Sequence, residues 1–85
     1  MNRREIYDRM KRSPANVRFD DICRNAVEFG FLSRGGRGSH RIYVKPGVRE
    51  MLNFQNVNGM AKPYQVRQFT KLIEKYDLLG DQHVT

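Results

Sequence analysis

One histidine lies where a titratable side chain could do chemistry. His40 follows a run that contains Gly35, Gly36 and Gly38, and it enters a stretch of β-branched and aromatic residues at positions 42–44. Glycine allows the backbone to adopt positive φ and to come close to a ligand. Histidine can accept or donate a proton near neutral pH, so His40 is the candidate general base of this chain.

Basic side chains accompany this histidine along the sequence, and no acidic residue interrupts them between Arg34 and Arg49. The cations that we predict to contact the phosphates of a bound ligand are Arg34, Arg37, Arg41 and Lys45. Such a series suits an anionic polymer that places a phosphate near one imidazole. A glycine-rich run is also typical of a plain hairpin loop, and a run of arginines is also typical of a solvated face.

The composition limits the classes of protein that fit. The chain has 85 residues, and 16 Lys and Arg against 9 Asp and Glu give a net charge of +7. One domain is expected, with RNA, DNA, an anionic membrane surface or an acidic protein as its partner. The single cysteine, Cys23, excludes an internal disulfide and is expected to be a small core residue. No residue cluster has the spacing of a zinc or magnesium site, so we predict neither a metal nor another cofactor.

No signal peptide and no transmembrane segment are predicted. Residues 1–12 contain no continuous apolar run, and no run elsewhere approaches the ~20 apolar residues that a membrane span requires. We therefore expect a cytoplasmic protein without a membrane partner.

Hydrophobic periodicity predicts the elements that must position His40. Residues 2–12 are expected to form a short helix, with Asn2 and Glu5 in a capping box. Ile6 and Met10 share its thin apolar face. Because this face is so narrow, we expect the helix to pack loosely or to serve a partner.

A second helix is predicted over residues 19–29, with Gly30 as its C-terminal cap. Three strands are predicted to follow at residues 31–34, 39–45 and 50–57. The loops between them contain only a few residues. An antiparallel meander is therefore the expected pairing.

A loop is predicted at residues 58–62, and the last helix is predicted over residues 63–79. The helix is expected to begin at Pro63, because proline is favoured at a first helical position. The apolar stripe that is expected to cover one face of the sheet consists of Val66, Phe69, Leu72, Ile73 and Tyr76. The chain would thus divide into an N-terminal helix with its connector (1–18), a domain (19–79) and a disordered tail (80–85).

The predicted fold class is α+β, with helices packed on one face of a three-stranded antiparallel sheet in the order helix, helix, three strands, helix. This order resembles a double-stranded-RNA-binding domain. Strand alternation places His40, Ile42 and Val44 on one side of the sheet, and Ser39, Arg41, Tyr43 and Lys45 on the other. Spacing alone does not determine which side the helices cover, because one bulge would exchange the two sides.

Three features occur in a fixed order along this short basic chain. The first is Gly38-Ser39-His40 at the entry of the second strand, and the second is an aromatic residue, Tyr43, followed by Pro46. The third is a proline-started last helix, Lys62-Pro63-Tyr64-Gln65-Val66-Arg67-Gln68-Phe69. With these features the chain resembles the HicA family, the toxin halves of HicA–HicB toxin–antitoxin pairs. The match in element order runs from about Ile22 to Tyr76.

The resemblance implies a small cytoplasmic mRNA interferase, an endoribonuclease that works without a metal and inhibits translation. It implies that a HicB-like antitoxin protein covers His40, and it assigns catalysis to His40 and positioning to Gly38 and Ser39. The chain departs from the family in places. Arg41 stands where many members carry a second histidine, Gln55-Asn56-Val57 stands where many have a His-Pro, and residues 1–17 are an extension.

RNA carries its own nucleophile, the 2′-OH next to the scissile phosphate. His40 would remove that proton while Arg37, Arg41 and Lys45 stabilise the charge on the phosphorane. Tyr43 or a water would protonate the leaving group. Two alternatives stay open: a non-catalytic RNA-binding domain, and a module that docks a partner protein through an open sheet face or the first helix.

Overall fold

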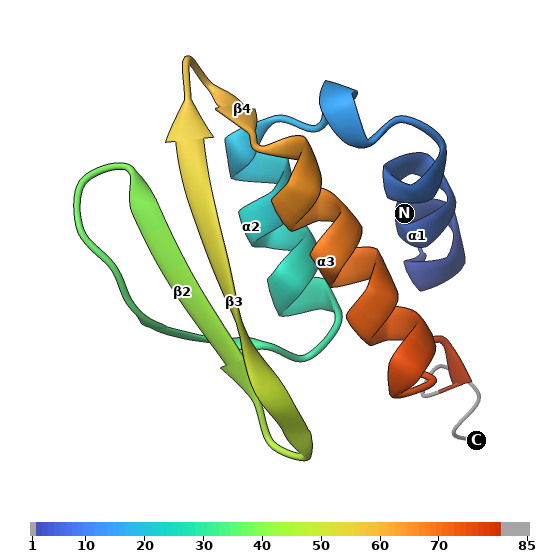
Figure 1. Cartoon of the computed structure of the whole chain (residues 1–85). Helices are drawn as coiled ribbons and strands as arrows, with labels where there is room; N and C mark the ends of the chain where they lie inside the picture. The colour runs from blue at the N-terminus through green and yellow to red at the C-terminus, as the bar shows by residue number, and fades with distance from the viewer. Residues whose placement is uncertain (1, 81–85) are drawn as a thin grey trace.

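The computed structural model describes residues 2–80 and arranges them in three layers (Figure 1). Helices α2 (Phe19–Glu28) and α3 (Pro63–Lys75) form the middle layer. An antiparallel sheet lies on one side of them, and α1 (Arg3–Arg12) lies on the other. A short 3₁₀ helix, η1 (Pro14–Asn16), joins α1 to the rest of the chain. The α+β class predicted from the sequence is confirmed.

The sheet contains four strands in the order β1-β2-β3-β4, one more than predicted. The strands are β1 (Leu32–Gly35), β2 (His40–Lys45), β3 (Val48–Val57) and β4 (Met60–Ala61). The bounds of β1, β2 and β3 differ from the predicted ones by at most two residues. Strand β4 was not predicted, because its residues lie in a segment that was predicted to be a loop.

The extra strand follows from a two-residue hairpin turn. Val57 pairs with Met60, and the residues between them, Asn58 and Gly59, have φ of 53° and 86°. Positive φ at both central residues defines a type I′ turn, for which Asn-Gly is the preferred sequence. The prediction of a loop at residues 58–62 was therefore wrong, because it overlooked this turn signal.

Helix α1 is packed into the domain. Its capping box is formed as predicted, since Asn2 Oδ1 accepts from the Glu5 amide at 2.9 Å and Glu5 Oε1 accepts from the Asn2 amide at 3.2 Å. Ile6 and Met10 are buried. On the opposite helix, the Glu74 carboxylate accepts hydrogen bonds from Tyr7 and Lys11. The first helix thus completes the core instead of lying loosely against it.

The last helix ends at Lys75, four residues before the predicted end. Asp77 adopts φ of 51°, a left-handed conformation that stops the helix. The Leu78 amide donates to the Ile73 carbonyl at 2.9 Å and the Asp77 amide donates to the Glu74 carbonyl at 3.3 Å. This pair of bonds is a Schellman motif, which satisfies carbonyl groups that the helix leaves unpaired.

Four phenylalanines form the centre of the core. Phe69 on α3 is fully buried, and its ring centroid lies 5.5 Å from Phe29, 5.7 Å from Phe31 and 5.8 Å from Phe54. The predicted apolar stripe of α3 is confirmed at its first four positions, Val66, Phe69, Leu72 and Ile73, all of which are buried, and the fifth, Tyr76, is half-buried. Aromatic contacts of this kind join the helices to the sheet.

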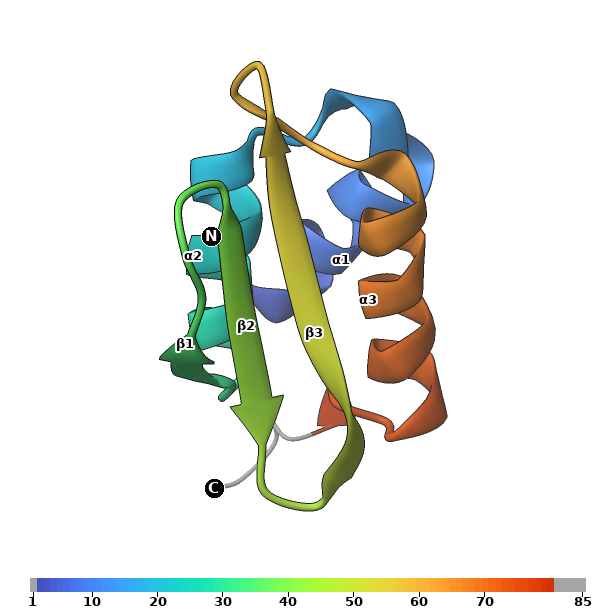
Figure 2. The same cartoon turned by 60° about the vertical axis from the view of Figure 1, so that its left-hand side comes forward.

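The helices cover the face of the sheet that carries Tyr43. Tyr43 on β2 and Leu52 and Phe54 on β3 are buried beneath α2 and α3. Alternation then places His40, Ile42 and Val44 on the other face, which is left open in Figure 2. The structure thus shows which face of the sheet the helices cover, which the spacing of the residues did not determine.

Candidate active site

His40 is the first residue of β2, and it lies at the corner of the open face. The residue is exposed, and its side chain makes no hydrogen bond within residues 2–80. Its backbone is held firmly, since the His40 amide donates to the Arg37 carbonyl at 2.9 Å. The neighbouring Ser39 carbonyl accepts from the Asn56 amide of β3 at 2.7 Å. A fixed backbone with a free imidazole suits a group that must meet a substrate.

The loop before His40 is shaped by glycine and by Arg41. Gly36 has φ of 126°, and a Cβ at this position would collide with the His40 carbonyl oxygen. The Arg41 guanidinium folds back over the same loop, where Nη1 donates to the Gly38 carbonyl at 3.0 Å and to the His40 carbonyl at 2.9 Å. Gly38, with φ of 56°, makes the turn that presents its own carbonyl to Arg41. Arg41 and the glycines therefore position the loop around His40.

The four cations predicted to contact phosphates differ in exposure, in their contacts and in their distance along the sheet from His40. Arg34 in β1 and Arg37 in the loop are exposed and form no ion pair within the described part of the chain. Arg41 is occupied by the loop carbonyls and lies 6.0 Å above the Phe19 ring. Lys45 is half-buried at the far end of β2, with its amine next to Gly30. Arg34 and Arg37 are thus the two exposed cations near the start of β2 whose side chains make no hydrogen bond or ion pair within residues 2–80, whereas the exposed Arg41 is bound to the loop.

Tyr43, the candidate general acid, does not share a face with His40. Its side chain points toward the helices and is only 7% exposed. Burial, followed by a hydrogen bond with the Cys23 thiol, raises the pKa of Tyr43 to about 12. Burial also raises the pKa of the half-buried Cys23 thiol. A buried phenol on the opposite side of the strand cannot reach a leaving group held at His40.

The structure adds Gln55, which the sequence analysis did not select. His40 of β2 pairs directly with Gln55 of β3, and side chains at such positions lie roughly 5 Å apart on one face. The backbone amide of Gln55 donates to Oε1 of the buried Gln65 side chain of α3 at 2.8 Å, which fixes this part of β3. The Gln55 side chain is therefore placed to hydrogen-bond a group bound at His40. Only the strand register reveals this neighbour.

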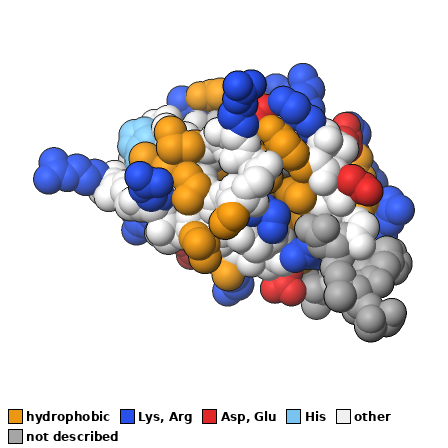
Figure 3. Space-filling model, turned by 90° about the horizontal axis from the view of Figure 1, so that it is seen from below, with side chains coloured by type: hydrophobic (Ala, Val, Ile, Leu, Met, Phe, Trp, Pro, Cys, Tyr) orange, Lys and Arg blue, Asp and Glu red, His pale blue; other side chains and the backbone are white. Residues whose placement is uncertain are grey.

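Apolar side chains occupy much of the rest of the open face, beside the polar Asn53. Leu32 pairs with Val44 across β1 and β2, and Leu32 and Met51 are 60% and 57% exposed. Figure 3 views the molecule from the end where β2 turns into β3, and it shows hydrophobic side chains at the surface among basic ones. Single exposed apolar residues are ordinary, but a group of them on one sheet face is typical of a contact surface.

No cluster of three or more histidine, cysteine or acidic residues that could hold a metal ion occurs among residues 2–80. Within the same residues, no helix has the length and apolarity needed to cross a membrane. The chain matched no protein-family model, no curated protein and no solved structure.

Proposed function

We propose that this protein is a HicA-like toxin of a type II toxin–antitoxin system, a metal-independent endoribonuclease that cleaves mRNA with His40 as its general base. The observation that carries the proposal is the placement of His40. Its imidazole is exposed, its backbone is fixed by the Arg37 and Ser39 hydrogen bonds, and Gln55 lies beside it. The exposed Arg34 and Arg37 and the net charge of +7 support an RNA substrate.

The proposed reaction uses the substrate's own hydroxyl. His40 takes the proton from the 2′-OH, whose oxygen attacks the adjacent phosphorus, and the bond to the 5′ oxygen breaks. A water protonates the departing 5′ oxygen, since Tyr43 is buried away from the site. Arg37 and the Gln55 side chain stabilise the charge on the phosphorane. The products are a 2′,3′-cyclic phosphate and a 5′-OH end.

The proposal includes a HicB-like antitoxin that covers His40, and a cytoplasmic location in which mRNA is encountered. The open sheet face supports such a protein partner, because Leu32 and Met51 are exposed next to the strand that carries His40. Burying these side chains against a partner would also shield the imidazole from RNA.

A cleavage assay on His40→Ala tests the proposal. The wild-type protein, in the presence of EDTA, is incubated with a 5′-labelled single-stranded RNA, and the new ends are analysed for cyclic phosphate. Loss of a general base should slow cleavage by about 100-fold or more. The melting temperature should not change, because the His40 side chain makes no hydrogen bond in the described residues. His83→Ala is the matched control and should cleave normally.

The same assay separates the alternative of a non-catalytic RNA-binding domain. That alternative is favoured by one observation, namely that Gln55 and not a second titratable group lies opposite His40. If the folded His40→Ala protein cleaves RNA as fast as the wild type, the nuclease proposal is refuted. RNA binding without cleavage by the wild type would support the binding domain.

A further inference from the structure

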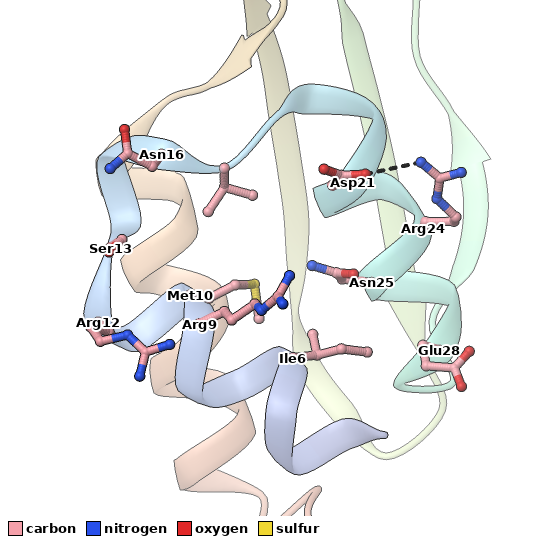
Figure 4. A pocket seen from close by; sticks show the side chains of 11 residues that line it. Ile6, Arg9, Met10, Arg12, Ser13, Asn16, Asp21, Arg24, Asn25 and Glu28 are labelled. Atoms are coloured by element: carbon pink, nitrogen blue, oxygen red, sulfur yellow. Dashed lines mark hydrogen bonds and ion pairs between the residues drawn. The ribbon is translucent and has the colours of Figure 1, made fainter. Parts of the chain in front are cut away.

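A groove lies between α1 and α2 (Figure 4). It is on the opposite side of the helix layer from the sheet, because α1 lies on that side (Figure 1). Its volume is about 550 Å³, which is within the usual range for sites that bind a ligand or peptide side chains. The groove is formed by the N-terminal extension, because α1 and η1 supply one wall and α2 supplies the other. It therefore has no part in the site proposed at His40.

The groove combines an apolar floor with polar walls. Ile6, Met10 and Val17 line it, and each is less than a tenth exposed because it also belongs to the core. From the two walls, the side chains of Arg9 and Asn25 point toward one another across the opening (Figure 4). An aliphatic group could rest on this floor while a polar group reaches the side chains above it.

The charge left unpaired in the groove is positive. On the α2 wall, Asp21 is neutralised by Arg24 at 2.9 Å. On the α1 wall, Arg9 and Arg12 form no ion pair within residues 2–80. The remaining acid, Glu28, points away from the opening in Figure 4. Basic residues in a last helical turn also suit the helix dipole, but that role does not require Arg9 to extend across the groove.

The length of the groove limits what can occupy it. Its walls run along residues 6–12 of α1 and 21–28 of α2. At ~1.5 Å per helical residue, each wall is about 10 Å long. An extended peptide advances ~3.4 Å per residue, so about three residues of a peptide match this length.

We propose that this groove binds a short acidic segment of a partner protein, with an aliphatic side chain on the Ile6–Met10–Val17 floor and a carboxylate against Arg9 and Arg12. The apolar floor and the surplus of arginine together select for this chemistry. Since the groove and His40 lie on opposite sides of the α2–α3 layer, this partner and RNA can bind at the same time. The inference goes beyond the proposed nuclease function and does not depend on it.

A peptide titration tests this site on the whole chain. The probe is a capped six-residue peptide of leucine and glutamate, Glu-Leu-Glu-Glu-Leu-Glu, added to the isotope-labelled protein and followed by the amide NMR signals. We expect saturable shifts confined to α1, η1 and α2. The peptide in which glutamine replaces glutamate, and the peptide in which glycine replaces leucine, should each bind at least about fivefold more weakly.

Variants of the two arginines supply the second readout. Replacing both residues, by Arg9→Gln with Arg12→Gln, should weaken binding of the acidic peptide by about tenfold and leave RNA affinity within about twofold. The matched control replaces two exposed arginines outside the groove, by Arg4→Gln with Arg67→Gln, and should bind the peptide as the wild type does. Circular dichroism verifies that both double variants remain folded.

Four results would overturn the proposal. Three come from the peptide titrations: no saturable shift with the acidic peptide at millimolar concentration, equal binding of the glutamine peptide, and equal weakening by the control pair. Shifts of the same α1 and α2 signals by RNA would also overturn it, because the groove would then belong to a nucleic-acid surface. Failure here leaves the His40 cleavage assay unaffected, so the two proposals can be tested separately.

Discussion

Replacing Phe69 by alanine probes the packing on which the sheet rests. The Phe69 side chain is fully buried, and its ring contacts Phe29, Phe31 and Phe54 at centroid distances of 5.5–5.8 Å. Deleting a buried phenylalanine side chain usually costs about 3–5 kcal/mol, because apolar burial is lost and a cavity remains. A chain of 85 residues has a free energy of unfolding of about 4–13 kcal/mol. The substitution should therefore remove a large part of the stability.

Urea unfolding followed by far-ultraviolet circular dichroism measures this loss. Gln68→Ala is the matched control, since Gln68 is the adjacent residue of α3 and is exposed. Its free energy of unfolding should stay within about 0.5 kcal/mol of the wild-type value. Phe69→Leu, which retains more of the buried volume, should fall between the two. A loss below about 1 kcal/mol for Phe69→Ala would contradict the inference that this ring holds the helices and the sheet together.

The remaining predictions concern acid stability, salt dependence and the loop before His40. Hydrogen bonds from Lys75 and then from Tyr76 lower the pKa of Glu50 from 4.5 to about 2. The stabilisation from these hydrogen bonds should be complete above about pH 4.5 and should be lost as the pH falls toward 2. In unfolding measurements, the difference in free energy of unfolding between the wild type and Glu50→Gln should therefore become smaller over that interval. RNA affinity should fall as the salt concentration rises, and the slope of log affinity against log salt concentration should be about −0.7 for each phosphate contacted on a single strand. Filter binding measures this slope, and an affinity that does not change with salt would argue against the phosphate contacts. Gly36→Ala should slow RNA cleavage more than Gly35→Ala does, because an added Cβ collides with the His40 carbonyl at position 36 and meets nothing at position 35. Equal activities of the two variants in the cleavage assay would show that cleavage does not need the close approach of residue 36 to the His40 carbonyl.

Local features of the fold were predictable because they depend on residues close in sequence. The capping box of Asn2 and Glu5 spans three residues, and the structure forms it as expected. Gly30 ends α2 with φ of 88°, a conformation that glycine adopts without strain. The Asn58-Gly59 turn was equally readable, and the loop predicted in its place reflects a missed signal and no hidden tertiary effect.

The face of the sheet on which each side chain lies was decided only by the tertiary structure. Residues on a strand alternate between two faces, and a register shift of one residue exchanges them. The structure contains such irregularities, between Ser33 and Gly35 and between Tyr43 and Lys45. Their positions depend on pairing between segments and on what the helices cover, neither of which local spacing encodes.

The candidate site was also only partly predictable, because local spacing does not encode contacts between distant segments. The sequence by itself determined that His40 follows flexible glycines and stands among cations at the start of a strand. Tertiary packing buried Tyr43 and brought Gln55 next to His40. It also made a groove from an N-terminal helix whose own sequence shows only a thin apolar stripe. These outcomes depend on contacts between residues far apart in the chain, whose free energies are set by the assembled core.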